Sequence, residues 1–265
     1  MPGEASIDRV ARWLAEARSV VVLTGAGVSA ESGLTTFRDP EEGLWSKYNP
    51  MDLATIEAFE RDPELVTRWY HWRFTKARDV RPNPGHDAIA LLERTLCARM
   101  PDNPPPFTLI TQNIDGLHQR AGSRRVVEIH GSIHRWRCTC TGYEKPLSEI
   151  RFDRFPVPSE HGGFMRPCVV WFGEMLPQEA LEASFEALAR CDLFFSIGTS
   201  ATVYPAAGFI EVARAAGART VEINKDPTAN SPSVDVTLKG RSGAILPDLV
   251  HQMDQLARGG DARDT

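Results

Sequence analysis

Ser19-Val-Val-Val-Leu-Thr-Gly-Ala-Gly-Val-Ser-Ala-Glu-Ser-Gly-Leu-Thr-Thr-Phe-Arg-Asp39 is the most informative stretch of this chain. It opens with an apolar, β-branched run, which is typical of a strand buried on both faces. Gly25, Gly27 and Ala30 follow with the G-x-G-x-x-A spacing of a dinucleotide-binding turn. We expect Gly25 to permit a tight turn, Gly27 to expose backbone to a pyrophosphate, and Ala30 to allow close packing. The stretch therefore predicts a strand and turn that bind a nucleotide.

The sequence after this turn differs from that of an ordinary dehydrogenase. Such enzymes carry an acidic residue about 20 residues further on, at the end of a second strand. Here Asp39, Glu41 and Glu42 precede Trp45 in a loop-like, aromatic stretch. We therefore expect a nucleotide fold used in an unusual way. On this motif alone, a glycine-rich turn without a ligand remains the alternative.

The bulk composition is that of a soluble globular protein. With 265 residues, of which 42% are hydrophobic and 25% charged, the chain can bury the core of one large domain with a small insertion. A net charge of −5 gives no reason to expect nucleic acid as a partner. No apolar run approaches a membrane span, and no secretory signal is evident. Five scattered cysteines favour a reducing cytosol, so we expect a cytoplasmic protein without membrane partners.

Apolar runs of strand length alternate with stretches of helical periodicity through most of the chain. Strands are predicted at 20–23, 107–111, 126–129, 169–172, 193–197, 220–223 and 234–238. Helices are predicted at 7–17, 63–78, 86–100, 177–189, 205–216 and 247–256. Residues 133–168 show little apolar periodicity and are expected to be irregular. This order predicts an α/β fold, a doubly wound parallel sheet of Rossmann type with a small inserted domain.

The predicted domains are discontinuous in sequence. The Rossmann-like nucleotide-binding domain is expected to comprise residues 1–38, 81–132 and 169–257. Residues 39–80 and 133–168 are expected to form the small domain, and residues 258–265 a disordered tail.

Four polar motifs stand at predicted strand ends, where an open α/β sheet binds its ligand. They are Gly25 to Gly33 with Phe37-Arg38-Asp39, Gln112-Asn-Ile-Asp115, His130-Gly-Ser132 and Gly198-Thr-Ser200. In order and spacing the set resembles the sirtuin family, the NAD-dependent protein-lysine deacylases. Arg166-Pro-Cys-Val-Val-Trp-Phe-Gly-Glu174 and Val221-Glu-Ile-Asn224 strengthen the resemblance, which spans about residues 15 to 250.

This resemblance implies that NAD is the cofactor. Phe37 and Arg38 would lie on a loop over it, and Asn224 would bind the adenosine ribose, which accounts for the acid missing after the first turn. Ser242 stands where family members contact the adenine. The implied cofactor-binding residues are Gly25, Ala26, Gly27, Ser29, Glu31, Thr35, Phe37, Arg38, Trp45, Gln112, Asn113, Ile114, Asp115, His130, Gly198, Thr199, Ser200, Asn224 and Ser242.

The implied reaction transfers an acyl group from lysine to ADP-ribose. The acyl-lysine oxygen is a weak nucleophile that attacks the ribose carbon as nicotinamide leaves, so a pocket that orients reactants and excludes water supplies much of the rate. His130 would be the general base, and Asn113 and Asp115 would complete the catalytic pocket. An isolated histidine is more often a satisfied strand-end residue, but its place among the other motifs favours the base. The expected products are nicotinamide, free lysine and 2'-O-acyl-ADP-ribose.

Tyr70 and Arg73 lie three residues apart in a predicted helix and therefore share a face. Tyr-x-x-Arg at this place resembles the sirtuin branch that removes succinyl and malonyl groups, and Ala54 resembles the small residues that widen its acyl pocket. An arginine can bind a terminal carboxylate through two parallel hydrogen bonds. An aromatic packing stripe with a solvated arginine is the alternative. The implied substrate-binding residues are Tyr70, Arg73, Ala54, Val170, Phe172 and Gly173, with acyl-lysine proteins or peptides as partners.

Many sirtuins hold a structural zinc on two Cys-x-x-Cys pairs, and that pattern is incomplete here. Cys138 fits the first position, but Thr141 stands at the second, and we expect the other pair at Pro158 and His161. Cys138, Cys140, His161 and Cys168 could form only a rearranged site with untypical spacing. We therefore expect no metal and a small domain held by packing alone.

Two other functions use the same NAD pocket. One is a protein ADP-ribosyltransferase, against which Tyr70 and Arg73 argue. The other is a non-catalytic sensor of NAD or acyl-ADP-ribose, against which His130 and Asn113 argue.

Overall fold

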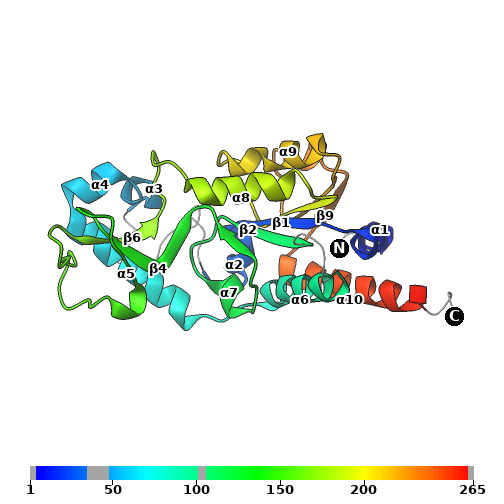
Figure 1. Ribbon diagram of the computed structural model, residues 1–265, viewed down its shortest axis with the longest axis horizontal. Helices are drawn as coiled ribbons and strands as arrows, with labels where there is room; N and C mark the ends of the chain where they lie inside the picture. The colour runs from blue at the N-terminus through cyan, green and yellow to red at the C-terminus, as the bar shows by residue number, and fades with distance from the viewer. Residues whose placement is uncertain (1–3, 35–47, 101–105, 262–265) are drawn as a thin grey trace.

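The computed structural model describes residues 4–34, 48–100 and 106–261, and these form an α/β fold with a second, smaller sheet (Figure 1). In this described part, six parallel strands make the large sheet in the order β3-β2-β1-β7-β8-β9. They are β1 (Val20–Thr24), β2 (Phe107–Thr111), β3 (Val126–Glu128), β7 (Leu193–Ile197), β8 (Arg219–Asn224) and β9 (Val236–Lys239). The chain winds outward from β1 to β3 and then returns to β7 on the other side of β1. The predicted doubly wound sheet is confirmed, with its switch point between β1 and β7.

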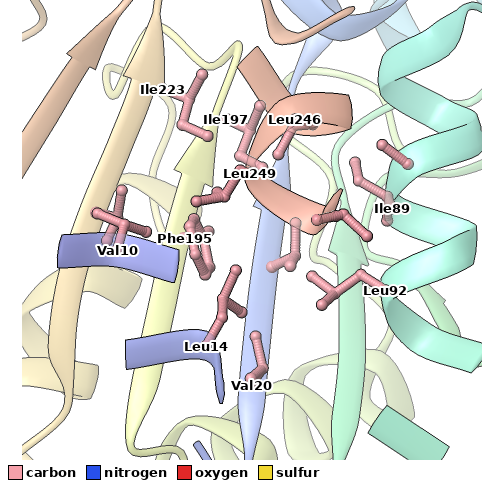
Figure 2. Close-up of a cluster of buried hydrophobic side chains, with 14 of the residues drawn as sticks. Val10, Leu14, Val20, Ile89, Leu92, Phe195, Ile197, Ile223, Leu246 and Leu249 are labelled. Atoms are coloured by element: carbon pink, nitrogen blue, oxygen red, sulfur yellow. The ribbon is translucent and has the colours of Figure 1, made fainter. Parts of the chain in front are cut away.

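Helices cover both faces of this sheet (Figure 1). One face carries α1 (Glu4–Glu16), α6 (Pro84–Arg99) and α10 (Ser242–Asp261), and the other carries α8 (Gln178–Leu188) and α9 (Phe209–Ala215). Val20 and Val22 point into the first core, shown in Figure 2, whereas Val21 and Leu23 point into the second. Successive residues of the apolar run at 20–23 are therefore buried on alternate faces of the sheet. Burial of each side chain contributes roughly 1.5–3 kcal/mol to the free energy of folding.

The small module combines helices with an antiparallel sheet, at the left of Figure 1. Its elements are α3 (Pro50–Leu53), α4 (Ile56–Arg61), α5 (Pro63–Asp79), β4 (Gly131–Cys138), β5 (Glu144–Pro146), the short 3-10 helix η2 (Leu147–Glu149) and β6 (Met165–Val169). The expectation of irregular structure at 133–168 is therefore wrong, and the strand predicted at 169–172 ends at Val169 instead. The pairing of β4 with β6 shifts between Ser132 and Trp136, which breaks the alternation by which a strand is recognised.

The start of α10 is decided by a contact from elsewhere in the chain. The sequence predicts a helix that begins at Pro247, because proline is best tolerated in the first turn of a helix. In the structure α10 begins at Ser242 instead and contains Pro247. A Glu31 carboxylate oxygen accepts hydrogen bonds from Ser242 Oγ at 2.6 Å and from Gly243 N at 3.0 Å, which satisfies a free donor of the first turn. The helix also continues to Asp261, through residues placed in the predicted tail.

The remaining elements are short. They are α2 (Ala26–Ala30), α7 (Leu117–Arg120) and two 3-10 helices, η3 (Ala206–Gly208) and η4 (Ser231–Ser233). In the described ranges, none of the helices has the length and apolar character needed to cross a membrane. The exact domain boundaries stay a prediction.

Candidate active site

Gly25 and Gly27, which follow β1, must be glycines because their backbone lies close to that of Gly198 at the end of β7. Gly25 has φ −129°, a conformation open to any residue, so the expectation of a special tight turn there is wrong. A Cβ on Gly25 or Gly27 would lie 2.9 Å or 2.7 Å from the carbonyl oxygen of Gly198. The Gly27 amide donates to that oxygen at 2.8 Å. The glycines therefore bring two strand-end loops together at the switch point; contact of Gly27 with a pyrophosphate stays a prediction.

A network of buried polar side chains joins the loops after β1, β2 and β7. Asn113 Nδ2 donates to the Gly25 carbonyl at 3.0 Å and lies 3.1 Å from Ser29 Oγ. Ser29 Oγ in turn donates to an Asp115 carboxylate oxygen at 2.7 Å. Gln112 Nε2 reaches Thr199 Oγ1 at 2.9 Å. The structure thus brings together residues that lie up to 174 positions apart in the sequence, from Gly25 to Thr199.

The carboxylate of Asp115 also accepts from the Leu117 amide at 2.9 Å, which fixes the turn that follows β2. Ile114, between the two polar residues, is buried in the core of the small module. This loop is therefore held from both sides, by polar contacts to the large sheet and by apolar contacts to the small one.

His130, which follows β3, is positioned through its Nδ1 atom. Nδ1 lies 3.1 Å from the Gln112 carbonyl oxygen, and because a carbonyl can only accept, Nδ1 carries the proton. Nε2 is then left with its lone pair. Burial lowers the pKa of His130, opposed by the hydrogen bond to Gln112. The ring is therefore neutral with a basic Nε2, which is the form that a general base requires.

Two buried histidines beside this network were missed by the sequence reasoning. His86 is fully buried, with its Nε2 3.5 Å from Ser29 Oγ, and its ring lies 4.8 Å from that of His118. Burial, with a contribution from His86, lowers the pKa of His118 to about 3. His86 is the third residue of α6, which follows the capping residue Asn83, and in the sequence it is simply a residue of the first helical turn. Nothing local indicates that it reaches the turn after β1.

The adenosine side of the predicted site lies around Thr199. Asn224 Nδ2, at the end of β8, donates to the Thr199 carbonyl at 2.8 Å. Ser200 Oγ lies 2.8 Å from Thr202 Oγ1 on the loop after β7. Glu31 and Ser242 bond to each other, so the carboxylate of Glu31 has a structural partner, and its contact with the cofactor stays a prediction.

The predicted substrate-binding segment after β6 connects the base to the small module. Val170 N donates to the His130 carbonyl at 3.0 Å, and Phe172 N donates to the Ala54 carbonyl at 2.8 Å. Gly173 follows with φ +87°, a backbone conformation that favours glycine. Tyr70 is fully buried on α5, and its hydroxyl oxygen lies 2.9 Å from Trp171 Nε1. The segment therefore links His130, Ala54 and Tyr70.

Four predicted cofactor contacts, Thr35, Phe37, Arg38 and Trp45, lie outside the described residues. Those that are described fit a dinucleotide. They stand at the carboxyl edge of the sheet, at the switch point where such folds bind nucleotides. Asn113 and Asp115 are each 8% exposed, and they provide the carboxamide and carboxylate groups suited to a nicotinamide amide.

The residues at the zinc position of the family do not fit a zinc ion. Cys138 is hydrogen-bonded by the hydroxyls of Thr141 and Ser159, and its Sγ donates to the Gly162 carbonyl at 3.3 Å. Ser159 and Gly162 are thus the residues of this segment that bond to Cys138, whereas the place of the second pair at Pro158 and His161 stays a prediction. Structural zinc takes thiolate, imidazole or carboxylate ligands, and this set offers a single thiol. At this position, hydrogen bonds to Cys138 connect the end of β4 to the segment around Ser159 and Gly162.

The rearranged metal site of Cys138, Cys140, His161 and Cys168, considered from the sequence, is not formed in the structure either. Met165 pairs with Cys138, so Cys168 lies three residues away along β6, about 10 Å. Cys140 and His161 are exposed. Across residues 4–34, 48–100 and 106–261, no group of three His, Cys, Asp or Glu side chains could hold a metal ion.

We therefore predict that a strong zinc chelator leaves both the melting temperature and any NAD-dependent activity unchanged. The reason is that hydrogen bonds, and not a metal ion, hold Cys138 to Thr141, Ser159 and Gly162. Metal analysis of protein purified from zinc-supplemented medium should find far less than one zinc per chain. The triple variant Thr141→Cys, Ser159→Cys, Gly162→Cys adds three thiols in the segments that contact Cys138 and should acquire zinc, although Gly162 has φ +86° and the new side chain there will be strained. Stoichiometric zinc in the unmodified protein, or a chelator-induced fall in melting temperature, would contradict this prediction.

The comparisons with known proteins agree with this geometry. A model of the Sir2 family matches residues 25–205. NAD-dependent protein deacylase 2 of Pyrobaculum aerophilum is 51% identical over 253 residues, covering 94% of this chain and 96% of that protein. A solved Sir2 homologue–NAD complex superposes with a TM-score of 0.85 at 39% identity, covering 94% of both chains. Sir2Af2 bound to a myristoylated histone peptide superposes with a TM-score of 0.78 at 35% identity, covering 97% of this chain and 99% of that one. With such similarity over most of its length, the chain belongs to the Sir2 family.

Proposed function

We propose that this NAD-dependent protein deacylase prefers acyl-lysines that end in a carboxylate, namely succinyl- and malonyl-lysine, and also accepts acetyl-lysine. The coarser activity follows from its relatives, which are named as NAD-dependent protein deacylases, and from the NAD-bound homologue. The finer preference is supported by one arrangement, the proximity of Tyr70 and Arg73 on α5, with Ala54 in the same buried cluster as Tyr70.

The position of Arg73 favours carboxylate binding over a solvated surface role. The charge of Arg73 acts on the Tyr70 hydroxyl and favours its ionisation, so the two groups are close. Arg73 is half-buried, with its guanidinium carbon 5.1 Å from the centre of the Trp69 ring. The planar, forked guanidinium of an arginine matches the geometry of a carboxylate, with which it can form two parallel hydrogen bonds. Ala54, 3% exposed, is buried in the same hydrophobic cluster as Tyr70, and its small side chain is the feature that resembles the wide acyl pocket of the branch that removes succinyl and malonyl groups.

The residues of this chain supply binding, orientation and a base. When bound, NAD provides the electrophilic ribose carbon and the nicotinamide leaving group. Ser29, Asn113 and Asp115 form a pre-organised network at the expected nicotinamide side, so little rearrangement is needed there. His130 holds a proton at Nδ1 and is free to take one at Nε2. The segment from Val170 to Phe172 keeps the acyl pocket and this base at a fixed separation.

The test is mass spectrometry of a succinyl-lysine peptide and its acetyl twin, each incubated with the protein and NAD. We expect faster loss of the succinyl group, with succinyl-ADP-ribose formed and no reaction when NAD is omitted. Loss of acetyl alone would retain the deacylase and overturn the carboxylate preference. No loss of either group, with NAD still bound, would overturn the enzymatic proposal and favour a sensor. Transfer of ADP-ribose to protein without deacylation would favour the ADP-ribosyltransferase.

We also keep the cytoplasm as the expected location. The five cysteines are all free thiols, which suits a reducing compartment. Acyl-lysine peptides are the expected partners, and a related structure holds a myristoylated histone peptide.

A further inference from the structure

The Tyr70 hydroxyl is constrained by Trp171, which lies in the same hydrophobic cluster of the small module. Trp171 Nε1 lies 2.9 Å from the Tyr70 oxygen, and an indole N–H can only donate. The hydroxyl oxygen therefore accepts this bond, and its own proton must point elsewhere. Burial raises the pKa of Tyr70, so the hydroxyl keeps that proton at physiological pH. Tyr70 is thus set as a hydrogen-bond donor.

Trp171 is itself fixed by a buried ion pair. Its ring lies with its centre 3.3 Å from the guanidinium carbon of Arg166, and the ring of Phe59 lies 5.3 Å away on α4. Arg166 donates to both carboxylate oxygens of Glu174, at 2.7 and 2.9 Å. Glu174 in turn accepts from the Trp171 amide at 2.8 Å. The ion pair and the backbone bond close a ring of contacts around the tryptophan.

These charges are poorly solvated, which makes the arrangement rigid. Arg166 is 7% exposed, and its Nη2 group, which binds Glu174, also donates to the Val169 carbonyl oxygen at 3.0 Å. Removal of either ion partner would leave a buried charge, so the pair holds one geometry. The turn from Val169 to Glu174 is therefore fixed internally, and it also carries the backbone bonds to His130 and Ala54 described above.

We propose that Trp171 is a specificity-determining positioning residue, which directs the Tyr70 proton toward the carboxylate of a succinyl- or malonyl-lysine. This inference rests on the proposed acyl preference. Arg166 and Glu174 act one step further away by fixing the tryptophan ring. An acetyl group has no carboxylate to receive the Tyr70 proton, so the contact discriminates between the two substrates.

The test compares Trp171→Phe, Tyr70→Phe and the double variant on succinyl and acetyl peptides. Trp171→Phe keeps an aromatic ring and removes the N–H. We expect the KM for the succinyl peptide to rise about 5- to 10-fold, the effect of one misdirected hydrogen bond, with kcat nearly unchanged. Acetyl kinetics should stay near those of the parent protein. Because Trp171 acts through Tyr70, the double variant should resemble Tyr70→Phe alone.

Three results would overturn the inference. They are an unchanged succinyl KM in Trp171→Phe, an equal loss on both peptides at an unchanged melting temperature, and additive effects in the double variant. The parent protein separates this inference from the proposed function. If the parent does not cleave the succinyl peptide, the proposed preference fails and this inference with it, whereas an active parent with an insensitive Trp171→Phe variant removes this inference alone.

Discussion

Replacement of His130 by Ala should lower kcat/KM for deacylation by about 100- to 10,000-fold, the usual contribution of a positioned general base. The physical reason is the tautomer: the Gln112 carbonyl holds the proton at Nδ1 and leaves Nε2 as the base. The amide, carboxylate and hydroxyl contacts around Asn113 do not involve the imidazole, so NAD affinity should change little. Mass spectrometry of the peptide, together with calorimetric titration of NAD, measures both quantities.

His251→Ala is the matched control, because His251 is exposed on α10 and should leave both activity and NAD binding unchanged. Deacylation that persists in His130→Ala would assign the base to another group. Loss of NAD affinity in parallel with activity would instead indicate a structural role for the ring.

The pH profile of the parent protein gives a second check on the same residue. The base acts in its neutral form, and burial disfavours the charged form, so the pKa of His130 lies below its ordinary value of 6.5. At pH 6.5 more than half of the imidazole is therefore neutral. The acidic limb of kcat/KM should have its midpoint below pH 6.5, and a midpoint above it would contradict the assignment.

Replacement of Arg73 by Met should lower kcat/KM on the succinyl peptide by about 100-fold while leaving the acetyl peptide near the parent value. The loss corresponds to about 2.7 kcal/mol, within the range for a charge-assisted, two-point contact with a carboxylate. Methionine removes the guanidinium that lies 5.1 Å from the centre of the Trp69 ring but keeps a long, unbranched apolar side chain, so packing is largely retained. Parallel kinetics on the two peptides measure the difference.

Arg73→Lys serves as the companion variant, since lysine keeps the charge but lacks the planar fork. It should fall between the parent and Arg73→Met on the succinyl peptide. An equal loss on both peptides in Arg73→Met would show that the residue supports the fold, and no loss on either would remove it from the acyl pocket.

Much of the large domain was predictable because its information is local. The run at Val20 to Leu23 buries alternate residues on two faces, which makes it apolar throughout and recognisable as a parallel strand. The strand-end polar residues follow from the same topology, because the carboxyl ends of parallel strands meet at one edge. Gln112, Asn113 and Thr199 could therefore be placed in one site before their contacts were known.

The small module was less predictable because its order depends on pairing. The bulged register between β4 and β6 hides the alternation of Ile133, Trp136 and Cys138 on the buried side. The cluster around Cys138 is likewise visible only once the chain brings Ser159 and Gly162 beside it.

The sequence by itself thus determined the fold class, the strand-end motifs and the family resemblance, all of which depend on residue type and spacing along the chain. The tertiary structure alone decided that Gly25 and Gly27 are needed by Gly198, that Glu31 begins α10 through Ser242, and that Trp171 orients Tyr70. The reason is range: each of these contacts joins residues about 100 or more positions apart, and its energy comes from close approach and hydrogen-bond direction, which no local pattern encodes.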